Sequence, residues 1–162
     1  MNKLNLVILM VCTPFLANAG EASVKWLDFN DYRDVRPANE SKSGYHKRIA
    51  KQFEKHIQKL MAGVPAGYKL DLTFEDIDLA GDVRFNMHDI RIIKSIHFPR
   101  MKLSYTLTDK SGKVLAQADK KVIKDLSFMD RIRMGRDEAF YFDKRLLKDW
   151  FDEHIDAVIP KS

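Results

Sequence analysis

The chain has 162 residues and a formal net charge of +5 at pH 7, from 28 Lys and Arg against 23 Asp and Glu. This positive excess is small, and acidic residues are interspersed with the basic ones, so no nucleic-acid partner is expected. Cys12 is the single cysteine, which excludes a disulfide within the chain and any site built from several thiolates.

The first nineteen residues predict a secretory signal peptide. Lys3 precedes an apolar run over 4–16, and Ala17-Asn18-Ala19 places small residues before a cleavage point at Gly20. An uncleaved anchor is an alternative, but the apolar run is about 13 residues and a membrane span needs roughly 20. Lipidation of Cys12 is a second alternative, with Val11 standing where a small residue is required.

Cleavage after Ala19 leaves a single mature domain over residues 20–162 that contains no cysteine, and it lowers the net charge to +4 by removing Lys3. We therefore expect a protein of the bacterial periplasm with no transmembrane span in its mature chain. The mild positive charge favours weak binding to anionic surfaces. No sequence pattern indicates a cofactor.

The first elements are a strand, a loop and a helix. Val24–Phe29 is the expected strand, and Tyr32–Gly44 the expected loop. Apolar residues then recur at helical spacing, which predicts a helix capped by Ser43 and ended by Gly63. This stripe consists of Tyr45, Ile49, Phe53, Ile57, Leu60 and Met61, while five basic residues cover much of the rest.

Alternation of apolar and polar residues predicts strands in the middle of the chain. The expected strands are 68–75, 89–98, 101–107 and 114–123, with a hairpin turn at Asp109–Gly112. Residues 126–136 show no clean period. A final helix is expected from about Glu138 to Val158, capped by Asp137, with an apolar stripe of Phe140, Leu147, Trp150, Phe151, His154 and Val158.

This order predicts an α+β single domain, with a mostly antiparallel or mixed sheet of about four to five strands and two main helices packed on one face.

The acidic segment 75–82 departs from the alternation. If the pattern of Leu70, Leu72 and Phe74 continued, Asp76 and Asp78 would face the core, where unpartnered carboxylates are costly. A β-bulge near Glu75 would instead turn Ile77 and Leu79 inward. Asp76 and Asp78 would then accept backbone donors or pair with Arg84, Arg91 or Arg100.

Patterns for chemistry are weak. The segment from Asp76 fails as an EF-hand, because Ala80 and Met87 stand where oxygen ligands are required. No two histidines have zinc-type spacing, and no nucleophile elbow, phosphate loop or dinucleotide glycine pattern occurs. No catalytic residue and no metal ligand is therefore assigned.

Four short pieces carry a resemblance to a known family. They are Val24-Lys25-Trp26 with 32–36, Asp76-Ile77-Asp78-Leu79-Ala80-Gly81, Pro99-Arg100 with Tyr105, Leu107, Asp109 and Gly112, and Asp149-Trp150-Phe151. In this combination and order, the chain resembles a family of secreted proteobacterial proteins known only as a domain of unknown function. The resemblance implies a single exported domain and brings no catalytic residue or cofactor.

Motif positions that carry charge suggest one network. Asp34, Arg36, Asp76, Asp78 and Arg100 are its expected members, joining a strand end, the Pro-Arg segment and the N-terminal loop.

The function that we expect is a non-catalytic binding or envelope-assembly accessory, with an envelope protein as partner and an exposed sheet edge as one means of recognition. The alternative is a small hydrolase or metal-dependent enzyme using Asp76 and Asp78. A third class is an anionic-lipid or polysaccharide binder using the first helix.

Overall fold

The computed structural model describes residues 19–84, 90–130 and 138–160. The predicted signal peptide lies outside them except for Ala19, as does the predicted cap Asp137. In chain order the elements are β1 (Glu21–Trp26), α1 (Lys42–Met61), β2 (Lys69–Asp78), β3 (Asp82–Arg84), β4 (Ile90–Ile92), β5 (Arg100–Thr108), β6 (Val114–Lys124), α2 (Tyr141–His154) and a 3₁₀ turn at Asp156–Val158.

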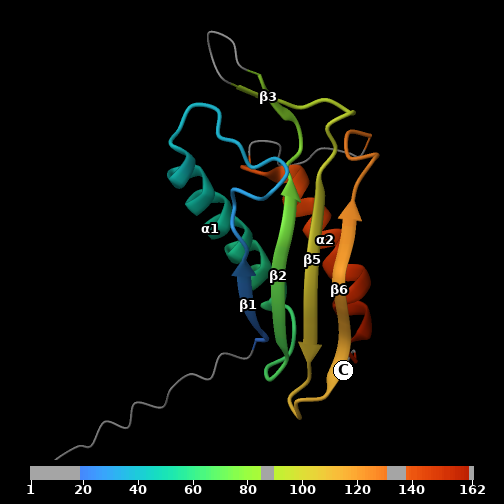
Figure 1. Ribbon diagram of the computed structural model, residues 1–162. Helices are drawn as coiled ribbons and strands as arrows, with labels where there is room; N and C mark the ends of the chain where they lie inside the picture. The colour runs from blue at the N-terminus through green and yellow to red at the C-terminus, as the bar shows by residue number, and fades with distance from the viewer. Residues whose placement is uncertain (1–18, 85–89, 131–137, 161–162) are drawn as a thin grey trace, which may run out of the picture.

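The main sheet has the strand order β1-β2-β5-β6. β1 pairs parallel to β2 through α1 as a crossover, and the β2–β5 and β5–β6 pairs are antiparallel, so the sheet is mixed. Figure 1 shows both helices on one face of this sheet, with β3 projecting beyond its end. The expectation of one α+β domain with two helices on one face is confirmed.

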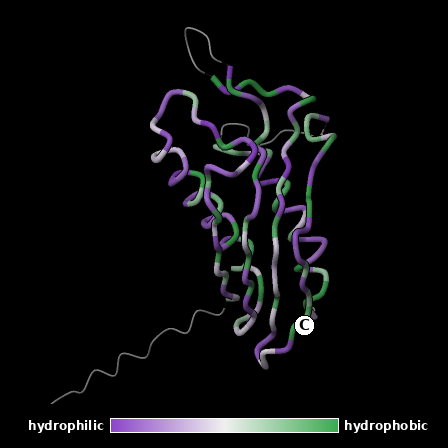
Figure 2. Tube along the Cα trace, viewed as in Figure 1, coloured by the Kyte–Doolittle hydropathy of each residue, from purple (hydrophilic) through white to green (hydrophobic). Residues whose placement is uncertain are grey.

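The core lies between the sheet and the two helices. In the tube of Figure 2, hydrophobic and hydrophilic residues are interleaved along the strands and helices. On α1 the buried side chains are Tyr45, Ile49, Phe53, Ile57 and Met61, as the stripe predicted. Aromatic contacts join the layers, because the Trp26 ring stacks on that of Phe74 within the sheet, with 4.6 Å between ring centres, and lies 6.3 Å from that of Phe53 on α1.

The predicted bulge in β2 is present. The pairing register with β5 shifts between Phe74 and Asp76, so two residues of β2 oppose one step of the partner strand. Ile77 and Leu79 are consequently buried at 0% and 1% exposure. The bulge was predicted because burying the carboxylates of Asp76 and Asp78 would be costly, and the observed register shift confirms it.

Four element predictions need correction. Residues 89–98 do not form one strand: among the described residues 90–98, only Ile90–Ile92 form a strand, and a turn follows in which His97 N–H donates to Lys94 O. Ile96 is 72% exposed instead of facing the core. The first strand is Glu21–Trp26, and α1 begins at Lys42 with Ser41 as its cap. The last α-helix runs over Tyr141–His154 instead of about Glu138–Val158, and Val158 is exposed.

The segment between β1 and α1 is hydrogen-bonded to β2 at the end of the sheet. The Tyr32 hydroxyl donates to Phe74 O over 2.8 Å and accepts from Leu27 N–H. Two residues later, Asp34 forms a parallel bridge with Asp78, in which Asp34 N–H donates to Ile77 O and Leu79 N–H donates to Asp34 O. These bonds place the Asp34 side chain beside the two-stranded β3–β4 sheet, which we call the β3–β4 arm.

Candidate functional site

Arg91 on β4 attaches the β3–β4 arm to the rest of the domain. Its guanidinium makes a two-pronged ion pair with Asp34, at 3.0 Å from Nη1 to Oδ2 and 3.2 Å from Nη2 to Oδ1. Nη1 also donates to Gly81 O over 2.8 Å, and Nη2 donates to Arg36 O. The side chains are 16% and 9% exposed, so the pair is largely withdrawn from water.

Asp34 stays ionised in this setting. Burial alone would raise the pKa of its carboxyl, but the hydrogen bonds and positive charge of Arg91, with further donors from Arg36, outweigh burial and hold the pKa below its ordinary value. Arg36 reaches Asp34 over 3.2 Å and Asp82 over 3.1 Å, which ties the loop to β3.

Asp76 and Asp78 belong to a second cluster. Asp76 accepts from Arg33 N–H over 2.8 Å and pairs with Arg100 at 3.3 Å. Arg33 lies 3.8 Å from Asp78. Burial raises the pKa of Asp78, and the neighbouring Arg33 opposes that rise.

The five residues of the predicted network thus fall into two charge clusters. Asp34 and Arg36 join Arg91 and Asp82, while Asp76, Asp78 and Arg100 join Arg33. Arg91, the most buried arginine of the two clusters, was foreseen only as one of three partners for the Asp76–Asp78 pair. The residues that line the adjoining cavity were not predicted.

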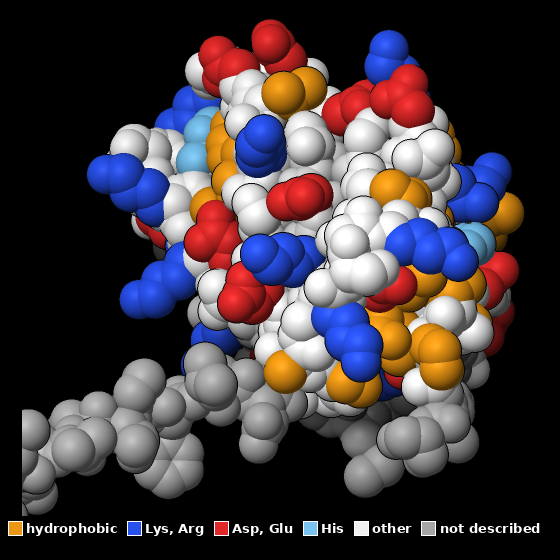
Figure 3. Space-filling view, turned by 90° about the horizontal axis from the view of Figure 1, so that it is seen from below, with side chains coloured by type: hydrophobic (Ala, Val, Ile, Leu, Met, Phe, Trp, Pro, Cys, Tyr) orange, Lys and Arg blue, Asp and Glu red, His pale blue; other side chains and the backbone are white. Residues whose placement is uncertain are grey.

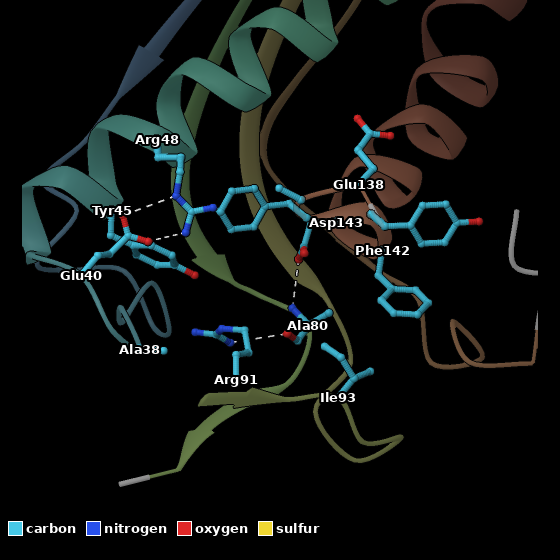
Figure 4. Close-up of a pocket in the computed structure, with 13 residues that line it drawn as sticks. Ala38, Glu40, Tyr45, Arg48, Ala80, Arg91, Ile93, Glu138, Phe142 and Asp143 are labelled. Atoms are coloured by element: carbon cyan, nitrogen blue, oxygen red, sulfur yellow. Dashed lines mark hydrogen bonds and ion pairs between the residues drawn. The ribbon is translucent and has the colours of Figure 1, made fainter. Parts of the chain in front are cut away.

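This cavity, of about 280 Å³, lies beside the first cluster. Its walls come from the loop before α1, from α1, from the turn after β2, from β4 with the residue that follows it, and from the first turn of α2 with the residues that precede it, as Figure 4 shows. They are mostly apolar, and the lining residues are Ala38, Glu40, Tyr45, Arg48, Ala80, Arg91, Ile93, Glu138, Ala139, Phe140, Tyr141, Phe142 and Asp143. We call this space the arm cavity.

The rim of the arm cavity is held by paired charges. Arg48 pairs with Glu40, and its guanidinium carbon lies 5.0 Å from the ring centre of Tyr45 and 5.1 Å from that of Phe140. Phe140 has a φ of 59°, a left-handed conformation that is uncommon for an aromatic residue. Glu138 pairs with the buried Lys144 at 2.6 Å.

Asp143 is a buried carboxyl of the inner wall. It is 3% exposed and accepts the Ala80 N–H over 3.0 Å. Burial raises its pKa to about 7, against the opposing effects of the Ala80 N–H and the Arg91 charge. Near neutral pH a large fraction of this carboxyl therefore carries a proton and has an O–H to donate.

The described residues hold neither a metal-type cluster nor a membrane-spanning helix. Across residues 19–84, 90–130 and 138–160, no group of three His, Cys, Asp or Glu side chains is placed to hold a metal ion. In the same ranges, no helix has the length and apolar character needed to cross a bilayer.

Lysines form a row on α1. Lys47, Lys51, Lys55 and Lys59 are all exposed and follow one another at four-residue intervals, so they share one ridge of the helix. Elsewhere the charges are mixed: at the end of the molecule seen in Figure 3, basic and acidic side chains are interspersed.

Comparison with known proteins gives one family and no further relatives. Neither the curated proteins nor the solved structures yield a match to the chain. The profile of the family described as "Protein of unknown function (DUF3016)" matches residues 20–153, which is most of the chain. The chain therefore belongs to this family of unknown function.

Proposed function

We propose that this protein is exported to the periplasm and acts there as a non-catalytic binding domain of the cell envelope, with the arm cavity as its ligand site. The observation that carries the proposal is the arm cavity itself: a mostly apolar space with a few convergent polar groups is the usual form of a small-molecule site. The Arg91–Asp34 pair supports this role because it fixes the β3–β4 arm, which supplies one wall.

Export is supported by the way the domain begins. Gly20 N–H donates to Val64 O over 2.8 Å, and a Cβ at this position would lie 2.7 Å from Met61 Cε. The residue that follows the expected cleavage point is thus packed against the end of α1. The family match also starts at residue 20.

Processing gives the first prediction. When the full chain is expressed in a Gram-negative host, we expect the protein in the periplasmic fraction with Gly20 as its first residue, as measured by intact mass. Ala19→Arg is expected to block cleavage, because it removes a small residue that the protease requires. A cytoplasmic, unprocessed wild-type chain would contradict export.

Ligand binding gives the second prediction. The neutral fluorophore N-phenyl-1-naphthylamine is expected to bind the folded mature chain saturably, with one site, because the arm cavity is mostly apolar. Ala139→Trp at the rim is expected to weaken this binding at least tenfold by occupying the opening. The measurement is a fluorescence titration.

A matched control separates filling of the arm cavity from the mere addition of a tryptophan. Ala157, exposed in the 3₁₀ turn at the other end of α2, carries the same substitution in Ala157→Trp. Equal binding by both variants would show that the fluorophore binds elsewhere, and absence of saturable binding by the wild type would contradict the proposed site.

A second function, weak attachment to anionic surfaces, is favoured by the lysine row on α1. Like charges four residues apart destabilise an isolated helix, so an external anion would relieve this repulsion. We expect the mature chain to sediment with vesicles containing anionic phospholipid at low salt, and not at about 1 M salt, where the Debye length is about 3 Å.

The test of this third prediction uses two double variants. Lys51→Gln/Lys55→Gln is expected to reduce sedimentation severalfold, whereas Lys110→Gln/Lys113→Gln near the β5–β6 turn is expected to have little effect. A similar loss of sedimentation in both double variants would show that binding depends on net charge alone and would contradict a role for the lysine row on α1.

A further inference from the structure

β6 forms one edge of the main sheet. It is the last strand in the order β1-β2-β5-β6, and within the described residues it pairs with β5 alone. A bulge at Lys120, whose φ is 52°, interrupts the strand. Beyond the bulge, Lys121–Lys124 pairs with residues 100–103 in regular register, so this stretch has an uninterrupted outer edge.

Two residues of this stretch direct their backbone groups away from β5. Asp125 N–H donates to Pro99 O over 3.2 Å, so Asp125 and Pro99 form a hydrogen-bonded pair. Such pairs alternate with non-hydrogen-bonded ones in an antiparallel ladder, which turns the N–H and C=O groups of Val122 and Lys124 outward. Within the described part of the chain, no hydrogen bond reaches these four groups. They are therefore available to an added strand.

A groove of about 320 Å³ lies beside the same stretch, between β6 and α2. In Figure 1, α2 lies behind β6 on the helix-covered face of the sheet. The apolar residues of the groove are Ile123, Leu146 and Trp150, which are 8%, 5% and 2% exposed. Because side chains alternate between the faces of a sheet, a strand residue opposite Ile123 would direct its side chain into this groove.

The charges around the edge indicate the kind of partner. Lys120, Lys121 and Lys124 are exposed, and none of them forms an ion pair within the described residues. Lysines on an edge repel a second copy of the same edge, whereas they attract an acidic segment. The α2 side of the groove carries Asp149 and Glu153, so an acid of the partner fits on the outer face of the sheet, beside Lys124.

We propose that the edge of β6 at Lys121–Lys124 binds an extended segment of a partner protein, which adds to the sheet as a fifth strand antiparallel to β6. The segment places an apolar side chain in the groove, against Ile123, Leu146 and Trp150, and an acidic side chain beside Lys124. This inference goes beyond the proposed ligand site, because the groove and the arm cavity share no lining residue.

The test adds the capped peptide acetyl-Ser-Glu-Leu-Val-Thr-Ser-amide to the ¹⁵N-labelled mature chain and follows binding by ¹H–¹⁵N NMR. In the antiparallel register, its Glu lies opposite Lys124, its Leu opposite Ile123 and its Val opposite Val122. We expect saturable binding, with the largest shifts at the amides of Val122 and Lys124. A peptide with Lys in place of Glu is expected to bind severalfold more weakly, because like charges then lie opposite each other.

Two methylated peptides test the strand pairing itself. The Val N–H of the peptide points at Val122 O, whereas the Leu N–H points away from β6, because hydrogen-bonded pairs alternate. N-methylation of the Val is therefore expected to weaken binding at least tenfold, and N-methylation of the Leu to change it less than twofold. Equal binding by the two methylated peptides, or no saturable binding to the folded wild type, would overturn the proposal.

A variant of the protein gives the reciprocal test. Val122→Pro removes an outward N–H and no hydrogen bond to β5, so the fold is kept while peptide binding is expected to fall at least tenfold. Val122→Thr keeps the N–H and is the matched control. Binding of N-phenyl-1-naphthylamine is expected to be unchanged in both variants, so failure of the peptide alone would leave the arm cavity as a ligand site. A dimer of the mature chain that Val122→Pro dissociates would assign the edge to a second copy and overturn the proposal.

Discussion

Arg91→Met is expected to lower the free energy of unfolding by about 3–5 kcal/mol, the usual loss when one member of a buried ion pair is removed. The substitution leaves the Asp34 carboxylate, 9% exposed, without its two-pronged partner, and it frees the backbone oxygens of Gly81 and Arg36. Urea denaturation of the mature chain at pH 7, followed by circular dichroism, measures the change.

Two variants show whether the loss comes from the buried pair. Arg36→Met removes a side chain that is 52% exposed, and its expected cost is about 1 kcal/mol or less. The double variant Asp34→Asn/Arg91→Met is expected to recover part of the stability lost in Arg91→Met, because no unpaired charge stays buried. If Arg91→Met lost no more than Arg36→Met, the attachment of the β3–β4 arm by Arg91 would be contradicted.

Asp143→Asn is expected to make the protein more stable at pH 8 and to give no such gain at pH 4. The folded carboxyl keeps its proton up to about pH 7, whereas the unfolded carboxyl releases it near the ordinary value of 3.8. Between these values the native state binds the extra proton, so the stability of the wild type falls as the pH rises. At 1.36 kcal/mol per pH unit, the full effect is about 4 kcal/mol.

Asparagine keeps an acceptor oxygen for the Ala80 N–H and has no proton to lose, so the variant lacks this part of the pH dependence. Other groups contribute to the setting of Asp143, since Arg91 on β4 lowers its pKa and Asp78 on β2 raises it. Denaturation at pH 4, 6 and 8 is therefore compared with Asp152→Asn, which changes an exposed carboxyl of the same helix. Parallel stability profiles for the wild type and Asp143→Asn would contradict a buried, proton-holding carboxyl.

The fold was predictable where local pattern and burial agree. The stripe on α1 and the alternation in β2 and β5 each place apolar side chains against one core, so period alone locates them. The bulge near Glu75 was predictable for a different reason: a regular register would have buried Asp76 and Asp78. The prediction of one strand over residues 89–98 was wrong, because the alternating isoleucines there belong partly to a three-residue strand and partly to the turn that follows it.

The arm cavity could not be derived from the sequence because its lining residues come from five separate segments that only the tertiary fold brings together. Asp143 and Lys144 illustrate the difficulty: both are charged residues at the start of a helix, where exposure is the ordinary expectation, yet they are 3% and 5% exposed. One sequence feature predicted part of the first charge cluster: Asp34 and Arg36 both lie in the short motif 32–36. Arg91 was visible only as one of several nearby arginines.

The most direct test of the arm cavity as the ligand site is to map binding by ¹H–¹⁵N NMR while N-phenyl-1-naphthylamine is added to the ¹⁵N-labelled mature chain. Our account predicts saturable shifts of the Ala80, Arg91, Phe140 and Asp143 amides, with the amides of Asp71, Thr106 and Gln117 on the uncovered face of the sheet unchanged. Shifts centred on that face, or no saturable shift at the arm cavity, would contradict it.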